Sequence, residues 1–426
     1  MGKTVEIRPR SAIKAVVHVP GSKSLTNRAL VSAALAQGKT VVEDVLIADD
    51  TMRMLEALEK LSFELHADEP SRKVTVNGSG GHVPAASGDI YAHQAGTVMR
   101  FLTALVALGK GPYRLDGDER MRERPIGPLV DALRSLGAAI EYEDKDGFPP
   151  LIVKGGIKGG QATVEASISS QFVSALLLIG PTLKKGLKLK LQGHVTSRPF
   201  IEMTLRLMRS FGADASWADE STLNVKPKKY SAPSGGRYAV EGDATAASYF
   251  WAAAVITGGE ATVDNVPADG LQGDAAFADI LASMGAHVTK DKRGITVSSG
   301  GAFNGITVDM NDIPDVVQPL AVTALFAKGR TRIENVGNLR VKETDRLYAL
   351  ETELKRLGAH VSTGPDWIEI DPAKSKLKGT QLRTYDDHRM AMSLALVGLR
   401  IPGVSIENPA CVSKTFPDFF QVLERL

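Results

Sequence analysis

Apolar residues recur at helical spacing in several segments of the chain, and these segments end in the same short signal. In four of them Leu, Phe or Met is followed by Gly-Ala and a short alternating strand, with the helix ending near Leu136, Phe211, Met284 or Leu357. A degenerate copy ends near Leu61. Apolar residues at this spacing bury one face of a helix, and a glycine just past the last turn adopts the left-handed C-cap conformation. The pattern predicts repeats in which an amphipathic helix leads into a strand.

The repeats are evenly spaced. The marker positions 62, 137, 212, 285 and 358 are separated by 75, 75, 73 and 73 residues, and a helix over 418–426 ends a sixth copy. One such α/β repeat is too small to bury its own core, and the period is too long for the common solenoids. We therefore expect an α/β protein in which three repeats pack around a centre in each of two domains.

Loop residues near the middle of the chain indicate where these domains meet. The segment 226–236 is rich in Pro, Gly, Ser and Lys, and a helical run begins at Ala244. We expect one crossing near 240–242 and, by symmetry, a second near 20–21. The N-terminal domain is then 21–240, and the C-terminal domain is 1–20 with 241–426.

The composition excludes several classes of protein. The chain has 426 residues, of which 43% are apolar and 23% charged, and its net charge of +2 argues against a nucleic-acid-binding coat. Its one cysteine, Cys411, precludes an internal disulfide and fits a reducing compartment. Neither a secretory signal nor an apolar stretch long enough for a bilayer is found. We expect a cytoplasmic protein with no membrane or nucleic-acid partner.

The sequence also lacks histidines and cysteines at the spacing of metal ligands, and it lacks a dinucleotide-binding fingerprint. We therefore predict no metal and no cofactor.

Candidate chemistry begins in the segment 20–28, Pro-Gly-Ser-Lys-Ser-Leu-Thr-Asn-Arg. It places Lys23, Arg28 and several hydroxyls at the start of a helix, where the free amides and the helix dipole favour an anion. A P-loop is excluded because Ser22 stands where that motif has glycine. A capped surface helix with solvated charges explains this segment equally well.

Other polar segments also precede helices, and each has an ordinary structural explanation. The arginines of 119–128 resemble a solvated charge run, one serine of 167–172 suffices as an N-cap, and Asp315 also suits a cap. Their common placement before helices favours a functional role over these structural explanations.

Lys342 and Arg346, four residues apart, are expected on one face of a helix start with Glu343 beside them. Six cations lie at or just before helix starts: Lys23, Arg100, Arg124, Arg346, Arg389 and Lys414. Such cations would bind small anions, with Asp315 and Glu343 as acid/base groups.

Five motifs resemble those of the 5-enolpyruvylshikimate-3-phosphate synthase family, and the likeness spans the chain. They are 21–28, Arg124-Pro-Ile-Gly127, Ser197-Arg-Pro199, Val341-Lys-Glu-Thr-Asp-Arg346 and Asp387-His-Arg-Met-Ala-Met392. The resemblance implies an inside-out α/β barrel of two domains that close like a clamshell. It implies transfer of the enolpyruvyl group of phosphoenolpyruvate to the 5-hydroxyl of shikimate 3-phosphate, with release of phosphate. This chemistry needs no cofactor, and we expect a monomer.

The resemblance also implies roles for residues at matching positions. The acid/base groups would be Asp315 and Glu343, assisted by Lys23. The residues for phosphoenolpyruvate would be Lys23, Gly96, Arg124, Gln171, Arg346, His388, Arg389 and Lys414. Those for shikimate 3-phosphate would be Lys23, Ser24, Arg28, Ser169, Ser170, Gln171, Ser197, Asp315, Asn338 and Lys342. Three positions depart from the family: Gln94 replaces Asn, Phe101 replaces Pro and Phe200 replaces Tyr.

Two other functions fit part of this pattern. The sister transferase acting on UDP-N-acetylglucosamine carries a reactive cysteine in its N-terminal half, whereas Cys411 lies near the end of this chain. A non-catalytic protein that binds anions or RNA ends would need the cations but neither Asp315 nor Glu343.

Overall fold

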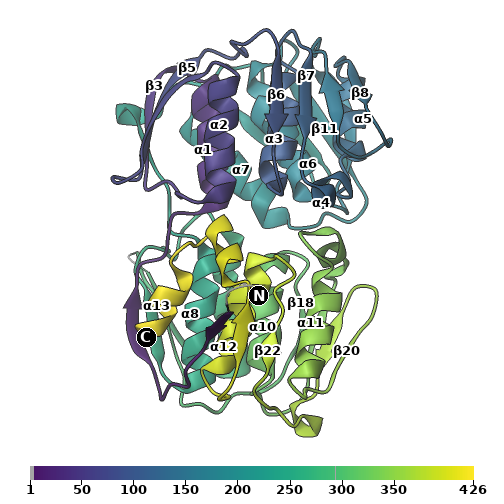
Figure 1. Ribbon diagram of the computed structural model, residues 1–426. Helices are drawn as coiled ribbons and strands as arrows, with labels where there is room; N and C mark the ends of the chain where they lie inside the picture. The colour runs from purple at the N-terminus through teal and green to yellow at the C-terminus, as the bar shows by residue number, and fades with distance from the viewer. Residues whose placement is uncertain (1–3, 293) are drawn as a thin grey trace. The chain divides into compact units, whose positions relative to one another are not determined.

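A computed structural model describes residues 4–292 and 294–426, which form two compact bodies (Figure 1). The N-terminal body is Gly21–Val240, and the C-terminal body is Met1–Pro20 with Glu241–Leu426.

The N-terminal body contains three four-stranded sheets of the same design. In each, the first strand is parallel to the second and the remaining pairs are antiparallel. The strand orders are β14 (Arg237–Ala239), β3 (Gln37–Glu43), β5 (Lys73–Ser79), β4 (Glu64–Asp68); β6 (Gly88–Tyr91), β7 (Tyr113–Asp116), β9 (Leu151–Val153), β8 (Ile140–Tyr142); and β10 (Gly160–Glu165), β11 (Leu187–Gln192), β13 (Thr222–Val225), β12 (Ala215–Asp219).

The C-terminal body repeats this design, with one shorter sheet. Its orders are β2 (Lys14–Val17), β15 (Glu260–Val263), β17 (Ile295–Ser298), β16 (His287–Lys290); β18 (Thr307–Asp309), β19 (Thr331–Glu334), β21 (Ile368–Ile370), β20 (Val361–Thr363); and β22 (Gln381–Leu382), β23 (Ser405–Glu407), β1 (Thr4–Glu6). The strands β1 and β2, from the start of the chain, thus complete sheets whose other strands come from its C-terminal half.

Each repeat has one inner helix, buried almost completely. The inner helices are α1 (Lys23–Leu35), α3 (Gly96–Val106) and α6 (Ser170–Ile179) in the N-terminal body, and α8 (Ala244–Thr257), α10 (Val317–Ala324) and α12 (His388–Gly398) in the C-terminal body. The three inner helices of each body pack against one another, and Figure 1 shows α8, α10 and α12 side by side. They form the centre of the core, because nearly every residue along each of them is buried.

The remaining helices cover the outside and are amphipathic. They are α2 (Asp49–Lys60), α5 (Gly127–Ser135), α7 (Arg198–Ser210), α9 (Phe277–Met284), α11 (Arg346–Arg356), α13 (Phe419–Glu424) and the single turn α4 (Glu119–Arg122). Short 3₁₀ turns are η1 (Gly180–Thr182), η2 (Ser234–Gly236), η3 (Gly273–Ala276), η4 (Pro314–Val316), η5 (Gly337–Val341), η6 (Pro372–Lys374) and η7 (Pro409–Lys414). The predicted α/β fold with threefold repeats is confirmed.

The marker residue after each outer helix has the left-handed backbone that the pattern predicts. The φ angle is +102° at Gly137, +79° at Gly212, +113° at Gly285 and +88° at Gly358. Ser62 stands at the same place with φ +62°, although it carries a side chain. The repeat thus imposes the turn even where the residue is not glycine.

We predict that Ser62→Gly stabilises the protein. A non-glycine residue in the left-handed region is disfavoured by about 1 kcal/mol, and relief of that strain should raise the midpoint of thermal unfolding by about 2–4 °C. Gly137→Ala is the matched control with the opposite sign, because its new Cβ would meet only ordinary contacts, the nearest at 3.4 Å, and test the backbone alone. A lower midpoint for Ser62→Gly would contradict the assignment.

Candidate active site

A buried network of ion pairs lies in the C-terminal body, where the loop before α11 meets η4 and the start of α12. We call it the charge cluster; its members are Asp315, Lys342, Glu343, Arg346, Asp387, His388, Arg389 and Lys414. Arg346 is its centre and only 1% of its side chain is exposed. Its guanidinium contacts Asp387 (Nε–Oδ2 2.8 Å), Asp315 (Nη1–Oδ1 3.2 Å) and Glu343 (Nη2–Oε2 3.0 Å). One arginine therefore joins three carboxylates from three segments.

The two predicted acid/base groups each contact further cations. Asp315 Oδ2 accepts a hydrogen bond from Arg389 Nη2 at 3.0 Å, and Lys342 Nζ lies 3.8 Å from Asp315 Oδ1. Lys414 Nζ donates to Glu343 Oε1 at 3.0 Å. An anion that binds these cations must therefore share them with Asp315 and Glu343, which places both carboxylates beside it.

Local capping explains how the cluster is positioned, and it corrects one prediction. The expectation that Lys342 and Arg346 share a helix face is wrong, because α11 begins only at Arg346, where Asp345 caps it by accepting from the Tyr348 amide at 3.0 Å. Lys342 has an extended backbone. Arg346 therefore reaches Asp315 from the first position of the helix, whereas Lys342 reaches it from the loop before the helix.

Asp387 holds in place the part of the charge cluster that lies at the start of α12. It is the N-cap of α12 and accepts from the Arg389 amide at 2.8 Å, while the same carboxylate holds Arg346. Asp387 and His388 are completely buried, and His388 Nδ1 lies 3.7 Å from Asp387 Oδ1. The start of α12 is thereby fixed to the start of α11.

Electrostatics favour the charged form of both central arginines. Burial opposes the charge of Arg346, but Asp387, Glu343 and Asp315 outweigh it and raise the pKa of Arg346. Burial likewise opposes the charge of Arg389, and Asp315 leads the groups that raise its pKa. Both guanidiniums are therefore cationic at neutral pH.

Asn338 lies in η5, a few residues before the charge cluster. Its Oδ1 atom is buried and has no hydrogen-bond partner among the described residues. A buried polar atom without a partner is rare and needs an explanation. A ligand hydroxyl or amine is one partner that would satisfy it.

The predicted residues of the N-terminal body lie at the starts of its inner helices. Lys23 and Ser24 are the first two residues of α1, behind the N-cap Ser22. Lys23 Nζ forms an ion pair with Asp50 Oδ2 at 3.2 Å, and both side chains are largely buried. The sequence analysis missed Asp50; the acidic pair at the start of α2 was the available signal.

Gly96 starts α3 and lies against two arginines. A Cβ atom at this position would lie 2.6 Å from Arg124 Nη2 and 3.0 Å from Arg100 Nη1. The neighbouring Thr97 accepts from Gln171 Nε2 of α6 at 3.4 Å. The structure thus brings Gly96, Arg124 and Gln171 to the starts of two helices that pack together.

Two of the predicted serines, Ser169 and Ser197, are helix N-caps. Ser169 is the N-cap of α6 and accepts from the Gln171 amide at 3.2 Å, and Ser170 follows it, 6% exposed. Ser197, the N-cap of α7, has a left-handed backbone with φ +57° and is 4% exposed. Backbone strain in a residue other than glycine is concentrated at functional sites, which singles out Ser197.

Arg28 is buried without a carboxylate partner in the described ion pairs. It donates to Thr204 Oγ1 at 2.7 Å and to Ser174 Oγ at 3.1 Å, and burial lowers its pKa to about 9. The guanidinium carbon also lies 5.2 Å from the ring centre of Phe101 and 6.0 Å from that of Phe200. Two of the three departures from the family motifs therefore surround one predicted binding residue.

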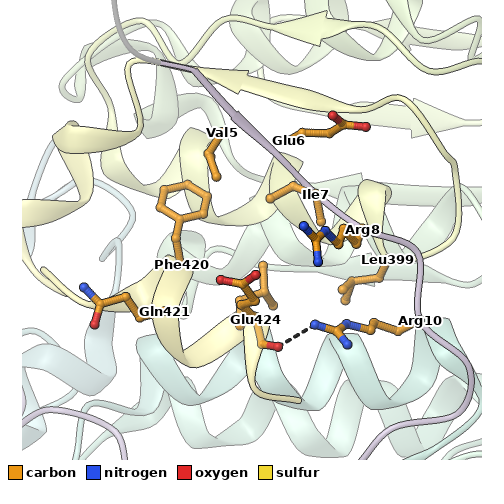
Figure 2. A pocket seen from close by; sticks show the side chains of 10 residues that line it. Val5, Glu6, Ile7, Arg8, Arg10, Leu399, Phe420, Gln421 and Glu424 are labelled. Carbon is orange, nitrogen blue, oxygen red and sulfur yellow. Dashed lines mark hydrogen bonds between the residues drawn. The ribbon is translucent and has the colours of Figure 1, made fainter.

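A separate pocket lies where the first strand meets the last helix, and its residues are shown in Figure 2. Its volume is about 320 Å³, and Ile7, Leu399 and Phe420 form part of its apolar wall. Arg10 donates to the main-chain oxygen of Glu424 across it. The pocket shares no residue with the charge cluster, so it is not part of the candidate site.

Two further searches of the described residues were negative. No group of three or more His, Cys, Asp and Glu residues there is arranged to hold a metal ion, and no helix there is long and apolar enough to cross a membrane. Burial raises the pKa of the Cys411 thiol to about 12, so it is not a reactive thiolate at neutral pH.

Cations and carboxylates gathered at helix starts are typical of an enzyme that binds small anions and transfers protons. Known proteins identify the family. Residues 7–423 match the family model described as EPSP synthase (3-phosphoshikimate 1-carboxyvinyltransferase), and the chain belongs to this family. A 3-phosphoshikimate 1-carboxyvinyltransferase of Marinomonas sp. (strain MWYL1) is 45% identical over 99% of both chains. That of Salmonella agona (strain SL483) is 44% identical over 100% of this chain and 99% of that protein.

Solved structures agree with this assignment. An EPSP synthase from Acinetobacter baumannii superposes with a TM-score of 0.80 at 26% identity, over 99% of this chain and 98% of that one. The predicted transfer of the enolpyruvyl group to shikimate 3-phosphate, a step of the shikimate pathway, is thereby confirmed. The UDP-N-acetylglucosamine enzyme and the non-catalytic binding protein are not favoured.

We predict that Arg346→Met destabilises the protein by roughly 3–5 kcal/mol, because it leaves buried carboxylates without their counter-charge. Lys355→Met is the matched control on the same helix: Lys355 is more than half exposed and, among the described residues, pairs only with Glu351, so its loss should change stability by less than about 1 kcal/mol. Thermal unfolding followed by calorimetry measures both. Equal midpoints for the two variants would show that the charge cluster does not hold the fold.

Proposed function

We propose that Asp315 and Glu343 are the acid/base pair of the enolpyruvyl transfer and that Lys23 assists them. The observation that carries this proposal is the charge cluster, in which both carboxylates contact cations suited to an anionic substrate. A carboxylate beside the cations that hold a substrate lies within reach of its reacting atoms, which is the first requirement for a general acid or base.

The reaction is an addition followed by an elimination. In the addition, the 5-hydroxyl oxygen of shikimate 3-phosphate bonds to the central carbon of phosphoenolpyruvate; the hydroxyl loses its proton to Asp315, and the methylene carbon gains one from Glu343. In the elimination, the bond from that carbon to the phosphate oxygen breaks, and the new methyl group returns a proton to Glu343. The departing phosphate takes up the proton that Asp315 accepted, so both carboxyl groups return to their starting states, and Lys23 stabilises the charge on that phosphate.

We assign phosphoenolpyruvate to residues of both bodies whose chemistry suits its phosphate and carboxylate. In the C-terminal body these are Arg346, His388, Arg389 and Lys414, and in the N-terminal body Lys23, Gly96, Arg124 and Gln171. Support comes from the buried, permanently charged arginines and from the close approach of Gly96 to Arg124. Guanidinium groups bind carboxylate and phosphate through paired, charge-assisted hydrogen bonds.

We assign shikimate 3-phosphate chiefly to hydroxyl and amide groups, as its polyol ring requires. The residues are Lys23, Ser24, Arg28, Ser169, Ser170, Gln171 and Ser197 of the N-terminal body, with Asp315, Asn338 and Lys342 of the C-terminal body. Support comes from the buried Asn338 oxygen that lacks a partner and from the strained Ser197. The two bodies would then be the two domains of the enzyme. The N-terminal domain would mainly bind shikimate 3-phosphate, and the C-terminal domain would mainly carry the acid/base groups.

We further propose that the protein acts as a cytoplasmic monomer. The exposed large apolar residues of the described part of the chain are Val16, Tyr91, Val341 and Tyr348. They provide little apolar surface for a stable interface between subunits. Light scattering after size-exclusion chromatography should give a mass near 45.4 kDa. A mass near twice that value would contradict the proposal.

We predict that Asp315→Asn and Glu343→Gln each lower kcat at least about 100-fold while substrate binding survives, because each change removes a proton-transfer group. Phosphate release in the presence of shikimate 3-phosphate measures turnover, and calorimetry measures binding. Glu334→Gln is the control, since Glu334 is a partly exposed carboxylate that pairs with Arg332, outside the cluster. Turnover within a few-fold of wild type in both cluster variants would overturn the assignment.

We predict that Gly96→Ala raises the KM for phosphoenolpyruvate roughly tenfold, a change equivalent to about 1.4 kcal/mol. The new Cβ would displace the flexible ends of Arg124 and Arg100, whereas the KM for shikimate 3-phosphate should change little. Gly300→Ala is the matched control, because nothing lies within 4 Å of its new Cβ. If both KM values rise equally in Gly96→Ala, Arg124 is not specific to phosphoenolpyruvate.

A further inference from the structure

One of the six sheets has three strands where the other five have four. In each complete sheet, the third strand of the order given above pairs with the second strand on one side and with a fourth strand on the other. In the remaining sheet β1 is the third strand, and among the described residues no strand pairs with its other edge. The edge of β1 is therefore open where this fold otherwise adds a strand.

The pairing of β1 with β23 shows which main-chain groups face the open edge. The Ile7 amide donates to the Val404 main-chain oxygen at 2.9 Å, so the main-chain groups of Ile7 point toward β23. This direction alternates along an antiparallel strand, so the N–H and C=O groups of Glu6 and Arg8 point away from β23. A strand added at this edge would bond to these two residues.

Burial shows what the open edge leaves uncovered. In the five complete sheets, the third-strand residue at the position of Val5 is completely buried. These residues are Val74, Leu151, Leu223, Ile295 and Ile368. Val5 likewise lies opposite a buried residue of the second strand, Ile406, but it is only partly buried itself. A fourth strand is the cover that its counterparts have and Val5 lacks.

The pocket of about 320 Å³ lies at this edge, between the segment 5–10 and α13 (Figure 2). In the complete repeats, the fourth strand follows the outer helix and places one apolar residue opposite the third strand. These apolar residues are Leu65, Ile140, Ala215, Val288 and Val361. The matching position here is opposite Ile7, which lines the pocket together with α13, the outer helix of this repeat. The pocket therefore suits one apolar side chain of an added strand.

Two charged residues on either side of Ile7 define the charges that a partner needs. Glu6 and Arg8 are exposed, and neither forms an ion pair within the described part of the chain. Arg10 differs, because it donates to the main-chain oxygen of Glu424. An antiparallel strand would place an acidic residue opposite Arg8 and a basic residue opposite Glu6 to form two favourable cross-strand pairs. Its sequence would run acidic, apolar, basic.

A second copy of this chain is a poorer occupant than a different protein. Its residues Glu6, Ile7 and Arg8 have the required order of charges. However, Ile7 is 6% exposed and belongs to the core of its own body, so it cannot enter the pocket of another copy. This agrees with the monomer proposed above.

We propose that the open edge of β1 and the pocket beside it bind an extended segment of another protein, in which an acidic, a branched apolar and a basic residue follow one another. The segment joins the sheet as its fourth strand, antiparallel to β1, and its apolar side chain enters the pocket. Main-chain hydrogen bonds provide affinity, and the pocket and the two charges provide specificity. This inference does not rest on the proposed function, since the pocket shares no residue with the charge cluster.

The probe is a fluorescent peptide, Thr-Glu-Val-Lys-Tyr-Thr, blocked at both ends and titrated with the full chain while its anisotropy is measured. We expect saturable binding. Exchanging Glu and Lys in the peptide should weaken binding at least about fivefold, because two attractive pairs become repulsive. Replacing its Val by Gly should weaken binding at least about tenfold, because the pocket then stays unfilled. No saturable binding, or equal affinity for all three peptides, would overturn the proposal.

Methylation of single peptide amides separates strand addition from binding of the apolar side chain alone. The amides of the Glu and Lys of the peptide face β1, so a methyl group on either should weaken binding at least about tenfold. The amide of its Val points away from β1, so a methyl group there should change the affinity less than about twofold. Equal effects at the three positions would show that no strand is added.

Arg8→Glu tests the pairing from the side of the protein. It should weaken binding of the first peptide and favour Thr-Lys-Val-Lys-Tyr-Thr, because both edge residues are then acidic. Lys328→Glu is the matched control: Lys328 is an exposed lysine of the same body outside the pocket, and its change should leave both affinities unaltered. If Arg8→Glu keeps the wild-type preference, the proposed register is wrong. Turnover should be unchanged in both variants, so failure here leaves the proposed function intact.

Discussion

The buried guanidinium of Arg346 is the interaction on which the candidate site depends. It contacts Asp315 before α10, Glu343 before α11 and Asp387 at the start of α12. Removing one partner of a buried ion pair leaves an uncompensated charge, so the three segments can only be buried together. This requirement places two carboxylates in fixed positions near each other, where the charged arginines and lysines also gather.

The threefold repeat explains why those segments meet. Each repeat contributes one helix to the centre of its body, and α10 and α12, with the capping loops around them, supply most of the cluster. The polar residues stand at helix starts because the interiors of these helices are buried among one another, and unpaired amides at a helix start accept negative charge. Packing of the core thus determines where anions can bind.

Regular features of the fold could be predicted from the sequence, because they follow from local chemistry that recurs. Glycine at a fixed interval marks a turn that needs positive φ, and even Ser62 adopts it. Cations before helices indicated the charge cluster, and the structure brings together Asp315, Lys342, Glu343, Arg346, His388, Arg389 and Lys414, all named in advance.

Features that depend on tertiary contacts could not be predicted in this way. The spacing of Lys342 and Arg346 suggested a helix, yet capping by Asp345 delays the helix to Arg346. Asp50 belongs to an acidic pair that suits the start of any helix, and only its burial beside Lys23 distinguishes it. Such burial is decided by segments far away in the chain.

In the proposed mechanism, Glu343 carries the proton to and from the methylene carbon while Asp315 serves the hydroxyl. The most direct measurement is the reaction in deuterium oxide, with the product and the recovered phosphoenolpyruvate examined by NMR. Wild type should place solvent deuterium on the methylene carbon, and Glu343→Gln should slow that incorporation together with turnover. Incorporation at the wild-type rate by Glu343→Gln would show that Glu343 does not transfer this proton.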